Sequence, residues 1–227
     1  MEVLIFEKEI SGYIGRLLRE NFGRGPGNVF CTFSRPFVTV YITNFLSPME
    51  KSLIGNRQSV YVQKTRDLMM ETLETEIRDF IETNTKEKVK EFYYDWNLDG
   101  KTGMFLFILE NNQKFKCEPF SNKDLIHKEI IDVSIEAEKP PQMVSSRLLN
   151  DRTMIIIREG ILVSIEKELI HIGFPETLKI AKRNLEKRLM AEHKANFEKL
   201  LSAQIIDQFV DWNFDQDKSY SLFILKP

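Results

Sequence analysis

A run of glycines around an arginine is the first feature of this sequence that could bind a ligand. The segment is Gly23-Arg24-Gly25-Pro26-Gly27, and successive backbone N–H groups in a glycine-rich turn can form a nest for an anion. Arg24 would add a positive charge to such a nest. The segment follows a predicted helix and precedes a predicted strand, which is the reverse of a phosphate loop. It therefore predicts either a small-anion site, with Gly23, Arg24, Gly25 and Gly27 as ligands, or a plain turn.

Two carboxylates and an arginine form the second candidate group. Glu50 stands three residues after Ser47, where the pair would form a capping box at the start of a helix. Arg66 falls on the apolar stripe of the next helix, where an unpaired charge would be costly. We therefore expect Arg66 to pair with Glu50 or Asp95. We therefore name Glu50, Arg66 and Asp95 as candidate ligand-binding residues. If they converge in one cleft, they could also perform acid–base chemistry; the alternative is a purely structural ion pair.

The spacing of Asp95, Asn97 and Asp99 imitates the first half of a calcium-binding loop. The glutamate that should follow at the twelfth position is absent, and strands rather than helices are predicted on either side. Aspartate and asparagine are also common in β-turns, so a turn is the better interpretation.

The histidines and cysteines show no spacing typical of a metal site or a catalytic triad. The sequence contains His127, His171, His193, Cys31 and Cys117. All three histidines follow residue 120, whereas the glycine run and Ser47 lie in the first half. We therefore expect no catalytic residue, no metal and no cofactor, and we interpret both cysteines as reduced thiols.

The elements that would position these residues occur twice. Asp95–Leu109 aligns without gaps on Asp211–Leu225, and the only two tryptophans coincide. The same shift of 116 positions, from Asp95 to Asp211, places residues 37–54 on residues 153–170. A repeat of this length predicts two copies of one structural unit.

Each copy is predicted to have the order α-β-β-α-α-β-β. In the first copy we expect a helix over residues 4–21, a hairpin over 28–42, a short helix from 48, a long helix over 59–82 and a last hairpin turning at 97–101. Hairpins give a mainly antiparallel four-stranded sheet with helices on one face, the α+β class. The predicted units are 1–110 and 124–227, joined by a linker at 111–123, and we expect them to be related by pseudo-two-fold symmetry.

Composition excludes several classes of protein. The 227 residues are 42% hydrophobic and 29% charged with a net charge of -2, which is typical of a globular protein and lacks the positive field expected for nucleic-acid binding. No apolar run approaches the roughly 20 residues needed to span a bilayer, so no membrane insertion is expected. Glu2 and Glu7 lie where a signal peptide would be basic and apolar, which favours a cytoplasmic location.

The first copy resembles the bacterial MpsC-like family. The resemblance rests on the glycine run, on Leu46-Ser47-Pro48-Met49-Glu50, on Arg66 and on Asp95, with Ser47 in place of the usual threonine. The second copy looks like a diverged member. It retains Leu162, Glu166, Leu169 and Asp211, and Arg183 lies one residue out of register with Arg66. The resemblance implies association with a sodium-translocating, membrane-potential-generating system linked to bicarbonate supply.

The sequence thus favours a non-enzymatic accessory or regulatory protein of sodium or bicarbonate transport. Its expected partners are membrane transport subunits, a small anion and a second copy of the chain. The alternatives are a small enzyme that uses carboxylates and arginine, and a scaffold whose two copies mimic a dimer of single-unit relatives.

Overall fold

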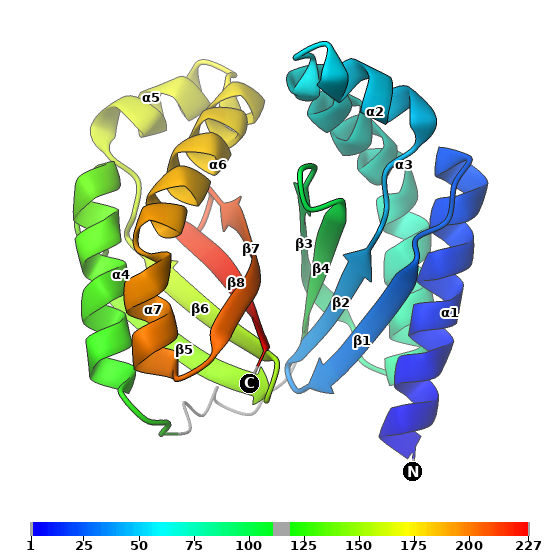
Figure 1. Cartoon of the computed structure of the whole chain (residues 1–227), viewed down its shortest axis with the longest axis horizontal. Helices are drawn as coiled ribbons and strands as arrows, with labels where there is room; N and C mark the ends of the chain where they lie inside the picture. Colours follow the sequence, from blue (N-terminus) through cyan, green and yellow to red (C-terminus); the bar gives the residue numbers. More distant parts are fainter. Residues whose placement is uncertain (1, 111–118, 227) are drawn as a thin grey trace. The chain divides into compact units, whose positions relative to one another are not determined.

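The computed structural model describes residues 2–110 and 119–226, and the chain divides into two compact units, Met1–Phe115 and Lys116–Pro227. Each unit has a four-stranded antiparallel sheet with helices packed on one of its faces (Figure 1). The predicted α+β class is therefore confirmed for both units, whereas their pseudo-two-fold relation stays a prediction. Residues 111–118 of the predicted linker lie outside the described residues, and Lys123 already belongs to a helix.

The first unit follows the predicted order of elements. These are α1 (Glu2–Phe22), β1 (Asn28–Ser34), β2 (Phe37–Thr43), α2 (Pro48–Gly55), α3 (Ser59–Thr85), β3 (Val89–Asn97) and β4 (Thr102–Leu109). The strand order is β1-β2-β4-β3, so the chain crosses from β2 through α2 and α3 to the far edge before it returns to the centre. The crossover carries α3 over the same face of the sheet that α1 covers.

Local sequence explains where these elements begin and end. Helix α1 stops before Gly23, whose φ of 68° is left-handed and suits glycine. Ser47 is the N-cap of α2, and Glu50 completes the predicted capping box. On β4, a side chain at Gly103 would lie 2.3 Å from the ring of its cross-strand partner Trp96. Glycine there lets the indole lie across the sheet and join the apolar core.

The second unit has one helix more than predicted. Its elements are α4 (Lys123–Ala137), β5 (Met143–Asn150), β6 (Thr153–Glu159), α5 (Ser164–His171), α6 (Pro175–Glu192), α7 (Lys194–Leu201), β7 (Gln204–Asn213) and β8 (Lys218–Lys226). The strand order is β5-β6-β8-β7, the same topology as in the first unit.

A break at His193 divides the counterpart of α3 into α6 and α7, so the expectation of one continuous helix is wrong for the second unit. His193 occupies the position of the buried Ile77. Its Nδ1 lies 2.6 Å from a carboxylate oxygen of Glu129, and its Nε2 lies 3.1 Å from one of Glu136, both on α4. The imidazole thus bonds to carboxylates of α4, whereas the aliphatic residue at this position in the first unit, Ile77, lies in the apolar core.

Candidate functional site

Arg66 is the centre of the candidate site in the first unit, because it is a charged residue only 1% exposed. Its Nε donates to Glu50 Oε1 at 2.7 Å, and its Nη2 donates to Glu50 Oε2 at 3.1 Å. Nη2 also donates to the carbonyl of Phe45 at 3.0 Å. The predicted ion pair with Glu50 is therefore confirmed, and its two parallel bonds are the strongest arrangement available to a guanidinium and a carboxylate.

Three aromatic rings enclose the same guanidinium. The Arg66 Cζ lies 4.5 Å from the ring centre of Trp96, 4.8 Å from that of Phe45 and 5.9 Å from that of Phe22. A guanidinium is weakly hydrated and is attracted to the faces of aromatic rings, which offsets part of the cost of burying it. We call Phe22, Phe45 and Trp96 the aromatic cage.

Glu50 serves the helix and the arginine at once. Its Oε2 accepts from the backbone N–H of Ser47 at 2.7 Å, and its own N–H donates to Ser47 Oγ at 3.3 Å. Burial raises the pKa of Glu50, but hydrogen bonds from Arg66 and Ser47 and the charge of Arg66 outweigh burial and lower the pKa. Glu50 therefore remains a carboxylate at neutral pH with both oxygens occupied.

The glycine run forms the connection between α1 and β1. Gly27 N–H donates to the carbonyl of Thr43 at 2.8 Å, so this amide is not available to a ligand. A side chain at Gly25 would lie 2.7 Å from Nε of Arg19, which shows that the loop lies against that arginine. Arg24 is half-buried and makes no ion pair with any described residue. A cation is therefore present beside Gly23, as the nest interpretation requires.

Asp95 does not join Glu50 and Arg66. It is 2% exposed on β3, and its Oδ1 accepts from the N–H of Trp96 at 2.7 Å. Successive side chains of a strand point to opposite faces, so Asp95 points away from the face on which Trp96 meets Arg66. The convergence of all three residues in one cleft, which the enzyme alternative needs, is not found.

The turn after Asp95 closes as a β-turn in both units. Asn97 Oδ1 accepts from the N–H of Gly100 at 3.0 Å, and Asn213 Oδ1 accepts from the N–H of Gln216 at 3.0 Å. This side-chain-to-backbone bond explains the Asp- and Asn-rich pattern without calcium. Across residues 2–110 and 119–226, no three His, Cys, Asp or Glu side chains are grouped so that they could hold a metal ion.

The second unit places a different cation on its equivalent of Glu50. Lys182 Nζ lies 2.7 Å from Glu166 Oε1 and 3.0 Å from both oxygens of Glu138. Lys182 stands 116 positions after Arg66, and Ile161 replaces Phe45 of the cage. A compact ammonium is strongly hydrated, so it needs the second carboxylate where the guanidinium uses aromatic rings. The two units thus stabilise a buried cation by different means.

Glu138 comes from the segment that replaces the glycine run. Burial and the neighbouring Glu166 together raise the pKa of Glu138 to about 7, although Lys182 opposes both effects. Two carboxylates that share one ammonium carry an excess negative charge, which explains why the second resists ionisation.

Two further details distinguish the second unit. Arg183, one residue out of register with Arg66, is also buried: it is 1% exposed, and Lys182 is 4% exposed. The N-cap of α5 is Val163, which has no hydroxyl. Its backbone N–H donates to Glu166 Oε2 at 3.0 Å, so the glutamate half of the capping box remains.

The core of the second unit also contains an ion pair that the sequence did not predict. Arg158 bonds Glu186 through Nη2 and Ser219 Oγ through Nε, the latter at 2.8 Å. The equivalent residues of the first unit are Ile42 and Met70, both in its apolar core. Comparison of the two copies position by position was the signal that could have revealed this exchange.

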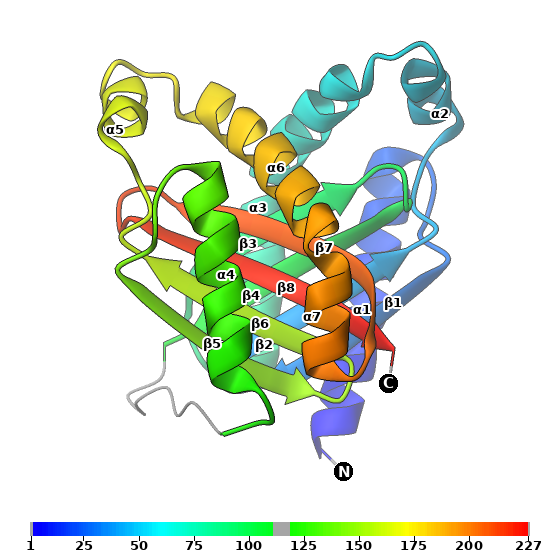
Figure 2. The ribbon, with the colours of Figure 1, turned by 60° about the vertical axis from the view of Figure 1, so that its left-hand side comes forward.

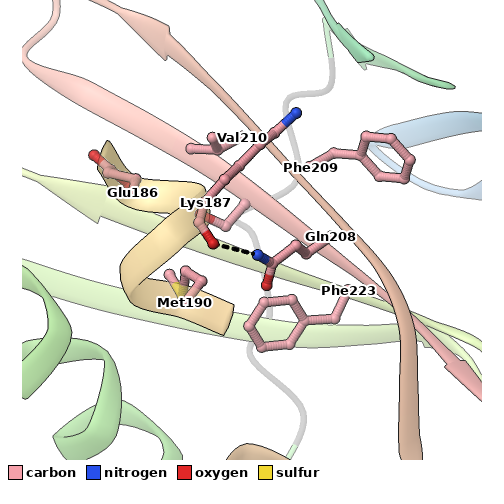
Figure 3. A pocket seen from close by; sticks show the side chains of 8 residues that line it. Glu186, Lys187, Met190, Gln208, Phe209, Val210 and Phe223 are labelled. Atoms are coloured by element: carbon pink, nitrogen blue, oxygen red, sulfur yellow. Dashed lines mark hydrogen bonds between the residues drawn. The ribbon is translucent and has the colours of Figure 1, made fainter. Parts of the chain in front are cut away.

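A small cavity lies beside this ion pair, between α6 and strands β7 and β8 (Figure 3). It is about 10 Å³, enough for one water molecule and too small for an organic substrate. Its lining residues are Glu186, Lys187, Met190, Gln208, Phe209, Val210, Ser221 and Phe223. Gln208 Nε2 donates to the carbonyl of Lys187 at 2.9 Å and closes one wall.

Known proteins resemble both halves of the chain. Residues 5–111 and 127–227 each match the family described as Na⁺-translocating membrane potential-generating system (MpsC). The uncharacterized protein YbcI of Bacillus subtilis (strain 168) is 31% identical over 105 residues, which are 46% of this chain and 83% of that protein. No solved structure matches. Within the described residues, no helix has both the length and the apolar character needed to cross a bilayer.

The two matched segments coincide with the two units of the structure and together include most of the chain. The match to YbcI has the length of a single unit. The chain therefore belongs to the MpsC family and contains two consecutive copies of the family's unit.

Proposed function

We propose that this chain is a non-enzymatic, cytoplasmic accessory or regulatory protein of a sodium-translocating system that generates membrane potential. The observation that carries the proposal is the match of both units to the family of that description. The role would be exercised by binding to the membrane-embedded transport subunits, in a system that also serves bicarbonate supply.

The geometry around Arg66 supports binding over catalysis. General acid–base chemistry needs a group that can exchange a proton near the working pH. Glu50 has a lowered pKa, and its oxygens bond Arg66 and Ser47. The pair therefore fixes α2 against α3, which maintains a surface rather than a reaction centre.

A small anion is the second ligand that we propose, at the glycine run. Two features favour this site: the left-handed φ of Gly23, and the guanidinium of Arg24, which forms no ion pair with a described residue. Bicarbonate or phosphate at millimolar concentration should raise the melting temperature, because a ligand that binds the native state stabilises it. The Arg24→Gln variant should lose this shift, whereas Arg152→Gln, which changes an exposed arginine of the second unit, should keep it. Equal shifts in both variants would refute the site.

Co-purification tests the proposed partner. A tagged chain is expressed in its native host, the membranes are solubilised in mild detergent, and the proteins that elute with the tag are identified by mass spectrometry. We expect integral membrane transport subunits at a stoichiometric level and none with the tag alone. Recovery of the chain without any membrane protein would contradict the proposal.

A further inference from the structure

Exposed apolar side chains gather where α2 meets the start of α3. Met49 is 65% exposed, Val60 is 44% exposed and Tyr61 is 61% exposed. They lie within residues 48–64, which we call the α2–α3 corner, and Figure 2 shows α2 at the end of its unit, beyond the strands. Single exposed apolar residues are ordinary, but a group of large ones often marks an interaction site.

Helix α2 is unusual because Glu50 is its one buried residue. Most short helices of globular proteins bury an apolar stripe. Here the buried residue is the carboxylate that bonds Arg66, Leu53 and Ile54 are half-buried against the core, and Met49 faces outward. The ion pair therefore helps to hold α2 in a position that leaves Met49 exposed.

All exposed charged residues of the α2–α3 corner are positive. Lys51, Arg57 and Lys64 are exposed and form no ion pair with a described residue. The one acidic residue of the segment, Glu50, is buried and neutralised by Arg66. Three cations without a described ion-pair partner therefore share this exposed segment with Met49, Val60 and Tyr61, and they complement an anionic surface.

We propose that the α2–α3 corner docks on an anionic lipid bilayer. Apolar and aromatic side chains enter the headgroup region, while flanking lysines and arginines bind lipid phosphates. Tyr61 suits this depth because its ring is apolar and its hydroxyl is polar. The cations are spread over 14 positions, from Lys51 to Lys64, which matches a surface of many headgroups better than a single acidic group on a protein.

The corresponding corner of the second unit provides a natural comparison. Ile165, at the position of Met49, is 66% exposed, and Phe174 is 52% exposed. Here, however, Lys167 pairs with Asp217 at 3.3 Å, and Glu168 and Glu176 are exposed. This corner has comparable apolar side chains without the uncompensated positive charge.

The inference does not depend on the proposed function, and pure lipid vesicles test it alone. The full chain is sedimented with phosphatidylcholine vesicles that contain either no anionic lipid or about 40% phosphatidylglycerol. An anionic share of about that size gives the vesicle a strong negative surface potential. We expect binding to the anionic vesicles only, weakening as salt screens the charges. Each basic residue near such a surface contributes about fivefold to affinity, so removing three should cost about 100-fold.

Two variants, each with a matched control, test whether the α2–α3 corner is the surface that binds the vesicles. A variant with three charge reversals in the corner, Lys51→Glu, Arg57→Glu and Lys64→Glu, should bind about 100-fold or more weakly. A control variant with the same change of net charge elsewhere, Lys8→Glu, Lys86→Glu and Lys101→Glu, should bind about fivefold more weakly at most. Serine at Met49, Val60 and Tyr61 should also weaken binding.

Serine at Ile165, Ile172 and Phe174, the exposed apolar residues of the second corner, should leave binding unchanged. Three results would overturn the proposal. These are failure to bind anionic vesicles at low salt, equal losses in the two charge-reversed sets, and binding only to native membranes that protease treatment abolishes. The last result would assign the corner to a protein partner.

Discussion

Replacing Arg66 by methionine should destabilise the first unit severely. The variant keeps most of the side-chain volume but leaves Glu50, which is 7% exposed, without its countercharge. Breaking a buried ion pair by removing one partner costs about 3–5 kcal/mol, because the remaining charge is buried and uncompensated. The hydrogen bond to the carbonyl of Phe45 and the contacts with the aromatic cage are lost as well.

A double-mutant cycle separates the ion pair from the other contacts. In the Arg66→Met, Glu50→Gln double variant no buried charge remains unpaired. The amide can still accept from the N–H of Ser47, so part of the cap survives. We expect the two substitutions together to cost less than their sum by about 1–3 kcal/mol, the coupling energy of residues in direct contact.

The tryptophans provide a reporter for each unit. Trp96 lies 4.5 Å from the Arg66 guanidinium, and Trp212 belongs to the second unit. In a Trp212→Phe background, fluorescence during urea unfolding reports the first unit alone. Lys64→Met, an exposed position on α3, is the control and should change the free energy of unfolding by about 0.5 kcal/mol or less. A loss below about 1 kcal/mol in Arg66→Met would refute a buried, stabilising pair.

Three further predictions follow from the described contacts. The pKa of Glu50 in the folded chain lies below its unfolded value of 4.5, so the stabilising contribution of Glu50 is complete above 4.5 and is lost as pH falls through the folded pKa. In urea unfolding at pH 3 to 6, the free energy of unfolding of Glu50→Gln should therefore fall less steeply with decreasing pH than that of the wild type. Hydrogen bonds that the His193 ring donates to the carboxylates of Glu129 and Glu136 raise the pKa of His193 despite partial burial. The stabilising contribution of His193 is therefore complete below 6.5 and is lost as pH rises through the folded pKa. His193→Gln should therefore lower the melting temperature more at pH 5.5 than at pH 8.5, and an equal drop at both would contradict the charged pair. Ser47→Ala removes the hydroxyl cap of α2 and should cost about 1 kcal/mol in urea unfolding; no change would mean that Glu50 holds this helix end alone.

Much of the fold could be predicted from the sequence because its signals are local. The capping box at Ser47, the stop at Gly23 and the repeated hairpins each depend on a few neighbouring residues, and the structure has all of them. The pairing of Arg66 with Glu50 followed from the cost of burying an unpaired charge. These predictions needed no knowledge of distant contacts.

The environment of the buried cations could not be predicted so easily, because it depends on tertiary contacts. Phe22, Phe45 and Trp96 are far apart in the sequence and meet only around Arg66. In the second unit the buried cation at the position of Arg66 is Lys182, which bonds Glu166. Glu138, which makes a lysine acceptable there, lies in a segment with no counterpart in the repeat.

The measurement that tests the central claim most directly is the sodium-dependent membrane potential of the native host. A voltage-sensitive dye would follow the potential after a sodium pulse in the wild type, in a strain that lacks this chain and in that strain carrying the gene again. An accessory role predicts a smaller sodium-dependent potential without the chain, restored by the gene, while transport subunits remain in the membrane. An unchanged potential in the deletion strain would contradict the account.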